Sequence, residues 1–404
     1  MKQISAQKPH ALQLPKLQRK EPEIHVEHNN MDFEVEQQET WEKYLVANPK
    51  NLLRKPIVPR ILTRPSSVQL SFRNAQIDQS FQMSYQTKPH FQTTSVSLST
   101  RFCISTGFDG KTVIHDLLNQ TQNAIQSSYP VFCSKVDDNV NSNLFAYGSL
   151  YGNVNVTNFN GDEIFSANTD NAILSLDFKQ KLAVGTESGM CVIYDIERKT
   201  QQKLIQHYAE VVQMQIEGNL CYTAGFDGVV NRNDLRAHAE ETEGLHNFES
   251  SLISHKLPII KMKIVNNKLL TASSNHIKVF DLRNNSTPLF ETTVDDLRTA
   301  DMNQNCLAYS DQKQTAVLNK EYFNTCESEI TCEHMQFMDR INDGLICTSS
   351  SKIYRIQKEQ VHEVHSIQGE LADKPEFNIS ALSMGLGGKN FAIGRLIGSL
   401  ELFD

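Results

Sequence analysis

A histidine, a hydroxyl and a carboxylate recur in this chain at matching distances. His207 lies 16 residues before Thr223 and 20 residues before Asp227, and His255 lies 16 residues before Thr271. A histidine with such partners could act as a general base, and with further ligands it could hold a metal ion. Neither histidine has the additional convergent groups that such a site needs, so we expect both to be structural.

Three other stretches resemble catalytic, phosphate-binding or metal-binding motifs, but their spacing or residue types do not match those motifs. Residues 148–152 place a serine among glycines, but not at the spacing of a nucleophile elbow. Residues 385–390 are glycine-rich, yet they lack the hydroxyl residue and the following helix of a phosphate-binding loop. Cys326, Cys332 and His334 do not have the spacing of a zinc site. The sequence therefore predicts no catalytic residue, no cofactor site and no metal site.

The candidate residues belong to a hairpin that repeats along the chain. Residues 222–235 are predicted to form a strand, a tight turn and a second strand. Similar hairpins have a turn residue followed six places later by the end of a strand. The eight spans from turn residue to strand end are 110–116, 152–158, 189–195, 228–234, 275–281, 313–319, 351–357 and 398–404.

The second strand of these hairpins alternates between apolar and other residues, as Val154 with Val156 and Ile277 with Val279 illustrate. A period of two indicates a strand with a buried face. Turn residues such as Gly110 and Asn275 should supply the positive φ that tight hairpins require. Units of about 40 residues made of short antiparallel strands have the size of one propeller blade. The predicted fold class is therefore all-β.

These units resemble WD40 repeats, and the resemblance covers residues 78–404. Four aspartates stand where that family has its Trp-Asp dipeptide, although the tryptophan is missing from every unit. They are Asp116, Asp195, Asp234 and Asp281. The resemblance implies a WD40-type β-propeller, with eight blades if each hairpin makes one, or seven if a degenerate unit is an insertion.

His207 and His255 stand where the family has its Gly-His dipeptide. The resemblance implies that His207, Thr223 and Asp227 form a structural hydrogen-bond set within one blade. It implies the same role for His255 with Thr271.

A propeller must close its ring, and the strand that closes it is predicted near 81–85, where the residues alternate correctly. Cys103, Cys221 and Cys306 occupy matching positions in their repeats, so they are predicted to be small core residues rather than disulfide partners.

Residues 1–77 are predicted to be an extension outside the propeller. Residues 1–31 are polar and predicted to be disordered, and 33–47 could form a short helix whose apolar stripe includes Trp41 and Tyr44. These two side chains could dock on the chain's own propeller or on a partner.

A basic, proline-containing segment follows at 50–65, with Arg54, Lys55 and Arg60 among its cations. This segment could contact a partner or RNA, or remain a solvated linker.

Composition restricts the function further. The net charge of −8 argues against a dedicated nucleic-acid binder, because phosphate contacts need clustered cations. No apolar run approaches the length of a membrane helix, and the N-terminus lacks the apolar core of a signal peptide. We expect a cytoplasmic or nuclear, non-enzymatic scaffold that binds other proteins as a subunit of a multiprotein complex. The alternative is a propeller of RNA processing or ribosome assembly that uses the basic arm.

Overall fold

The computed structural model describes residues 68–70, 76–77, 83–137, 139, 142–205, 207–236, 251–284, 287–319, 324–328, 331–338, 344–350, 352–357, 360–366, 378–384 and 390–403. They contain strands β1 to β34, and none of these described residues lies in an α-helix. The predicted extension features, including the helix over 33–47 and the basic segment 50–65, fall outside this part of the chain.

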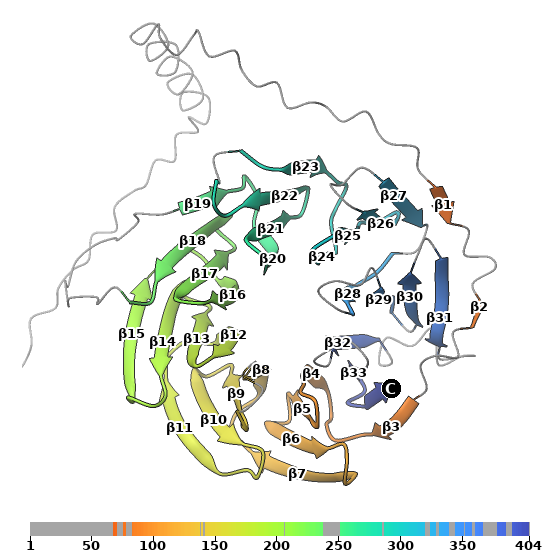
Figure 1. Ribbon diagram of the computed structural model, residues 1–404. Helices are drawn as coiled ribbons and strands as arrows, with labels where there is room; N and C mark the ends of the chain where they lie inside the picture. The colour runs from red at the N-terminus through yellow and green to blue at the C-terminus, as the bar shows by residue number, and fades with distance from the viewer. Residues whose placement is uncertain are drawn as a thin grey trace, which may run out of the picture. The chain divides into compact units, whose positions relative to one another are not determined.

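The strands from β3 onward form eight four-stranded sheets arranged as blades around a ring (Figure 1). The predicted all-β propeller with eight blades is therefore confirmed.

The first four blades, named A to D, have the following strands. Blade A has β4 (Thr93–Leu98), β5 (Phe102–Gly107), β6 (Lys111–Asp116) and β7 (Thr121–Gln126). Blade B has β8 (Val131–Val136), β9 (Leu144–Ser149), β10 (Asn153–Asn158) and β11 (Glu163–Asn168). Blade C has β12 (Ile173–Lys179), β13 (Lys181–Thr186), β14 (Met190–Asp195) and β15 (Thr200–Ile205). Blade D has β16 (Val211–Glu217), β17 (Leu220–Gly225), β18 (Val229–Asp234) and β19 (Ser251–Ser254).

Blades E to H continue around the ring. Blade E has β20 (Ile259–Val265), β21 (Lys268–Ser273), β22 (His276–Asp281) and β23 (Phe290–Thr293). Blade F has β24 (Thr299–Met302), β25 (Cys306–Ser310), β26 (Thr315–Asn319) and β27 (Asn324–Ser328). Blade G has β28 (His334–Phe337), β29 (Leu345–Thr348), β30 (Lys352–Gln357) and β31 (Gln360–Ser366). Blade H has β32 (Ile379–Met384), β33 (Phe391–Arg395), β34 (Leu400–Phe403) and β3 (Met83–Thr87).

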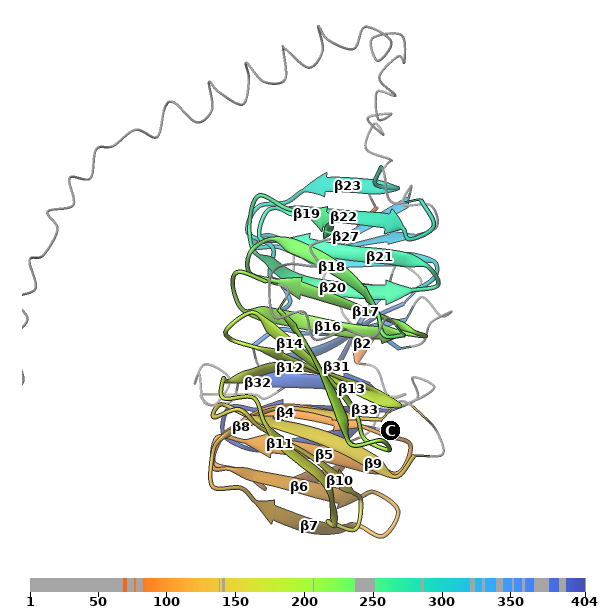
Figure 2. The same ribbon diagram turned by 90° about the vertical axis from the view of Figure 1, so that its left-hand side faces the viewer.

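Each blade places its first strand innermost (Figure 1), and the connections gather on two opposite faces (Figure 2). We call the face with the turns between second and third strands, and with the connections between blades, the turn face. The opposite face carries the turns between third and fourth strands.

The apolar core is divided among the seams between blades rather than gathered at one centre. Eight clusters of buried side chains each join two consecutive blades. The cluster of blades H and A includes Val96, Cys103 and Leu402, so the last blade packs on the first. Cys103, Cys221 and Cys306 are all buried, which confirms their prediction as core residues.

The turn glycines have the backbone geometry that the sequence predicts. Gly110, Gly152, Gly189 and Gly228 have φ between 75° and 83°. A Cβ at Gly189 would lie 2.2 Å from the carbonyl oxygen of His207, so a side chain there would clash with backbone. The same expectation for Asn275 is wrong, because its φ is not positive. Only two residues separate β21 from β22, whereas three separate β5 from β6.

The ring is closed by β3, which pairs antiparallel with β34 from Met83 opposite Phe403 to Thr87 opposite Leu400. Beside this junction, the buried Arg395 guanidinium makes two hydrogen bonds to Glu401, at 2.7 and 2.9 Å. The Gln86 side chain of β3 also donates to Glu401, at 3.4 Å. A buried, paired charge thus connects the two hairpin strands of blade H with the strand that closes the ring.

Two short strands precede the boundary predicted at residue 78. β1 (Val68–Leu70) pairs parallel with β27 of blade F, and β2 (Gln76–Ile77) pairs parallel with β31 of blade G. The chain therefore adds a fifth strand to the outer edges of two blades before it closes blade H.

Neighbouring inner strands are held in register by side chains that accept backbone hydrogen bonds across the seams. In blade C, the Asp177 carboxylate accepts from the Ile216 N–H at 2.7 Å. The other six acceptor and donor pairs among the described residues are Ser95 with Ser134, Ser97 with Val136, Gln213 with Met262, Gln215 with Ile264, Asp301 with Phe337, and Ser383 with Leu98. The last of these crosses the seam between blades H and A.

Candidate interaction surface

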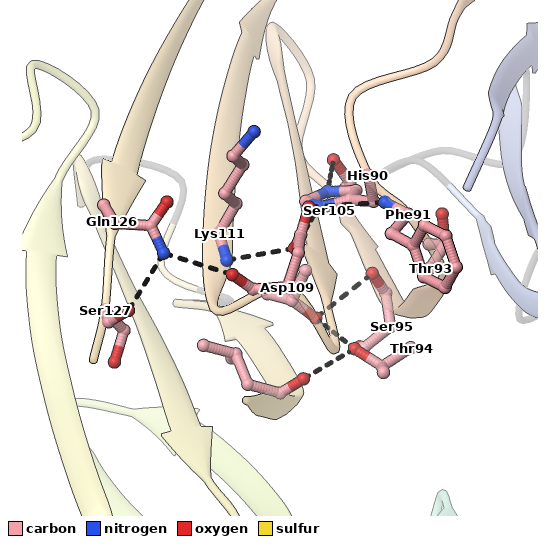
Figure 3. A network of polar contacts seen from close by, with 12 residues as sticks. His90, Phe91, Thr93, Thr94, Ser95, Ser105, Asp109, Lys111, Gln126 and Ser127 are labelled. Carbon is pink, nitrogen blue, oxygen red and sulfur yellow. Dashed lines mark hydrogen bonds and ion pairs between the residues drawn. The ribbon is translucent and has the colours of Figure 1, made fainter. Parts of the chain in front are cut away.

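A continuous polar network lies beneath the turn face of blade A (Figure 3). The His90 ring lies 3.2 Å from Asp109 through Nδ1 and 2.8 Å from the Ser105 hydroxyl through Nε2. On its other side, the same hydroxyl lies 3.0 Å from Nε2 of His115. The order of groups is thus carboxylate, imidazole, hydroxyl and second imidazole.

These contacts determine the direction of the hydrogen bonds. The Asp109 carboxylate accepts from Nδ1–H of His90, so Nε2 of His90 accepts from the Ser105 hydroxyl, and His115 donates to that oxygen. Burial lowers the pKa of His90 below its usual range, and burial followed by the neighbouring His90 lowers the pKa of His115 to about 3. Both imidazoles are therefore neutral at neutral pH, as the network requires.

The network resembles a carboxylate–histidine–serine triad, but its hydroxyl is enclosed. Ser105 is 0% exposed and His115 is 1% exposed. A nucleophile must meet its substrate within about 3 Å, and the Ser105 oxygen is already shared by two histidines. The arrangement is suited to holding a turn rather than to attacking a substrate.

Blade D carries the related set that the sequence singled out. His207 Nδ1 lies 3.0 Å from each carboxylate oxygen of Asp227, and His207 Nε2 lies 2.8 Å from the Thr223 hydroxyl. His207 is buried, so this set also lies beneath the surface. The three residues are in contact, in the arrangement that the resemblance implied.

Blade E has a reduced version of the set. His255 Nε2 lies 2.8 Å from the Thr271 hydroxyl. Burial, with smaller effects of Lys278 and His276, lowers the pKa of His255 to about 4. The carboxylate is replaced by Asn275, whose side chain contacts His276 instead, at 2.7 Å.

The four strand-end aspartates lie away from these sets, at the turns of the opposite face. Three of them form close ion pairs with a nearby arginine, and Asp195 contacts Arg198 at 3.9 Å. The close pairs are Asp116 with Arg101, Asp234 with Arg236, and Asp281 with Arg283. Their carboxylates also accept backbone N–H groups, as Asp116 does from Leu118 and Asn119. The sequence assigned the aspartates to the Trp-Asp place and the histidines to the Gly-His place of the repeat, and the structure puts these two places at opposite faces of the blades.

The buried sets of blades A and D hold exposed aromatic residues in place. The Asp109 carboxylate accepts from the backbone N–H of Phe91 at 3.3 Å, and Asp227 accepts from that of Tyr208 at 3.0 Å. Both aromatic side chains project into solvent, at 82% and 80% exposure. The residue preceding each aspartate is also an exposed phenylalanine.

Six exposed aromatic side chains follow one another along the turn face from blade A to blade D. We call them the aromatic rim: Phe91, Phe108, Tyr129, Tyr151, Tyr208 and Phe226. The Tyr129 and Tyr151 rings stack with their centroids 4.6 Å apart. On the opposite face, Leu118 and Leu289 are exposed large apolar side chains in the described turns between third and fourth strands.

Backbone hydrogen bonds connect the segments that carry this rim. Each turn donates to the connection entering its blade, as Phe108 does to Gln92 and Phe226 does to Glu210. Each turn also accepts from the connection leaving its blade, as Gly110 does from Ser127. The same alternation runs through blades B and C, at Leu150, Thr169, Glu187 and His207. The backbone that carries the aromatic side chains is therefore held in place by hydrogen bonds between turns and connections.

Sequence reasoning missed the blade A set and the aromatic rim. His90 precedes Asp109 by 19 residues, one fewer than separate His207 from Asp227. A searchable signal existed, because Gly-Phe-Asp-Gly occurs at 107–110 and again at 225–228, each downstream of a histidine followed by an aromatic residue.

The candidate partner contacts in the extension, Trp41, Tyr44, Arg54, Lys55 and Arg60, lie outside the described residues. Within the part of the chain that the structure describes, no group of histidine, cysteine, aspartate or glutamate side chains is placed to hold a metal ion. The same residues include no helix that could cross a membrane.

Solved structures share the architecture of this chain. The C-terminal WD40 domain of Sif2 matches with a TM-score of 0.65 and 9% identity, over 82% of this chain and 99% of that domain. The computationally designed Ika8 protein matches with a TM-score of 0.63 and 16% identity, over 77% of this chain and 95% of its own. No family model and no curated protein matches the sequence. The chain thus has the WD40-type β-propeller fold, with eight blades.

Proposed function

We propose that this protein is a non-enzymatic scaffold that binds other proteins as a subunit of a multiprotein complex. The observation that supports this most directly is the aromatic rim, with six large exposed side chains on one face. Exposed apolar groups that gather on one face of a protein commonly mark a binding site. Tyrosine and phenylalanine are also enriched at the centres of protein interfaces.

The rigidity of the rim favours binding. Association loses less entropy when the contacting groups are already ordered. Here Phe91 and Tyr208 are held through their backbone by the half-buried carboxylates of Asp109 and Asp227. The WD40-type fold commonly mediates protein interactions by presenting such surfaces, and the proposed role is the same.

The alternative, an RNA-associated propeller, depends on the basic segment 50–65. The turn face gives it little support, because the exposed Asp170 and Glu187 lie among its aromatic residues. Acidic groups oppose phosphate binding. Loss of RNA binding on removal of 1–65, with a steep dependence on salt, would favour this alternative.

A comparison of two double variants of the full-length chain tests the scaffold proposal. Tyr151→Ala with Tyr208→Ala removes two exposed rings from the turn face, and Leu118→Ala with Leu289→Ala removes two exposed apolar side chains from the opposite face. Proteins that copurify with the tagged chain are quantified by mass spectrometry. We expect the first variant to lose specific partners that the second retains.

Thermal melting of both variants provides the control for folding, since all four side chains are exposed. Equal recovery of every copurifying protein by the wild type and by the tyrosine variant, at unchanged melting temperature, would contradict the proposal.

A further inference from the structure

The aromatic rim contains an acidic interval. Between the stacked pair Tyr129 and Tyr151 and the next exposed ring, Tyr208, the turn face presents Asp170 and Glu187. Asp170 lies on the connection from blade B to blade C, and Glu187 lies on the turn of blade C. Both are exposed.

The charge of this interval is not offset by basic residues in the described segments around it. The described segments 150–152, 168–172, 186–189 and 207–210, which build this part of the face, contain no lysine or arginine. Glu210 adds a third carboxylate beside Tyr208. By contrast, the oxygens of Asp109 and Asp227 are engaged by a histidine and by backbone N–H groups.

The order of the segments determines the layout of the surface. Tyr151 lies on the turn of blade B, Glu187 on that of blade C, and Phe226 on that of blade D. Packed sheets lie about 10 Å apart, and an extended chain rises about 3.3 Å per residue. Two aromatic groups two blades apart are therefore roughly 20 Å from each other, a span of about six extended residues.

We propose that this part of the turn face binds an extended segment of a partner protein in which basic residues lie between two apolar residues. The apolar side chains pack on the tyrosine pair Tyr129–Tyr151 and on Tyr208 with Phe226. The basic side chains face Asp170 and Glu187, and an arginine can also lie over a neighbouring ring. This inference depends on the proposed function, because it specifies the partner of the same surface.

Selection from a display library of random eight-residue peptides, with the full-length protein as bait, tests the inference. We expect enriched peptides to carry lysine or arginine flanked on both sides by apolar residues. Glu187→Lys should weaken binding of a selected peptide by about tenfold or more. Glu197→Lys is the matched control, since Glu197 is an exposed residue on the opposite face of the same blade, and it should change affinity by less than about twofold.

Enrichment of peptides without basic residues, or equal effects of the two lysine substitutions, would overturn the inference. If the Tyr151→Ala and Tyr208→Ala variant nevertheless loses partners, the scaffold proposal stands and only the peptide class is wrong. Loss of no partner by that variant overturns the proposed function itself. The last probe is a labelled single-stranded oligouridine. If the protein binds it, and if Glu187→Lys strengthens and Tyr208→Ala abolishes this binding, the face would instead be assigned to nucleic acid.

Discussion

His115 shows how a single side chain couples folding of this propeller to pH. It occupies the second-to-last position of β6 and donates to Ser105 across the blade. Its Nδ1 atom is buried and has no hydrogen-bond partner among the described residues. A proton added there would place a positive charge away from water, so burial holds the pKa of His115 at about 3 in the folded chain.

The consequence is a loss of stability in mild acid. The folded pKa lies below the unfolded value of 6.5, so the unfolded chain binds the proton more readily between these two values. The contribution of His115 is complete above about pH 6.5 and decreases as the pH falls toward 3. We expect protonation of His115 on unfolding to lower the free energy of unfolding by about 2 kcal/mol when the pH falls from 7.5 to 5.

Urea denaturation of His115→Phe at these two pH values measures that effect. Phe280 occupies the same position in blade E, so the ring is compatible with the fold. The variant should lose less stability than the wild type on acidification, whereas Tyr194→Phe at the same position of blade C should behave as the wild type does. An identical pH dependence in His115→Phe would show that this histidine is not the group responsible.

For individual residues, the sequence predicts some of the hydrogen-bonded sets but not all of them, and it does not predict the aromatic rim. His207 and Thr223 could be paired because the spacing between them recurs at His255 and Thr271. The spacing did not identify His90, because the connection that enters blade A is one residue shorter and His90 lies 15 rather than 16 residues before its hydroxyl partner, Ser105. The exposure of Phe91 and Tyr208 was not predictable from residue type, since an aromatic residue beside a strand is usually a core residue.

At the scale of elements, the seams between inner strands rely on acceptors that reach across to the next blade. Asp301 of β24 accepts from the Phe337 N–H of β28 at 2.8 Å and from the Lys263 ammonium of β20 at 2.6 Å. This carboxylate therefore contacts both neighbouring blades. It is 2% exposed, so water cannot replace either partner.

Two substitutions at Asp301 separate its hydrogen bond from its charge. Asp301→Ala removes both acceptor atoms, leaves the Phe337 N–H buried and should cost about 2–4 kcal/mol of unfolding free energy. Asp301→Asn keeps an oxygen for that N–H and should cost less. Chemical denaturation gives both values, and equal losses would show that the backbone contact contributes nothing measurable.

The strands themselves were largely predictable, because hairpin glycines and alternating residues are local signals. The turns at Gly110 and Gly228 illustrate this, and the departure at Asn275 comes from a turn that is one residue shorter. β1 and β2 could not be predicted in the same way. They have three and two residues and pair with strands more than 250 positions away, so no local periodicity marks them.

At the scale of the whole molecule, we expect stability to depend on closing the ring. The apolar seams join each blade to the next, and the seam of blades H and A is completed by β3 and β34. An open ring would expose this seam and two strand edges together.

Deletion of 78–88 should therefore abolish the cooperative thermal transition of the propeller or lower its midpoint strongly. Differential scanning calorimetry makes the comparison, with deletion of 1–60 as the control. The control removes residues that precede the first described strand and should leave the midpoint unchanged. Closure is not required for stability if both deletions melt like the intact chain.

The pairing of β3 with β34 also imposes a delay during synthesis of the protein. Ser84 of β3 contacts Leu402, which lies 318 positions later. At about 5–20 residues per second, a ribosome needs roughly 15–60 s to make that stretch. Throughout this interval β3 has emerged without its partner strand, and Tyr85 lacks the apolar cluster that it packs against in the folded chain. The nascent chain must be kept from aggregating through β3 until its last blade has been translated.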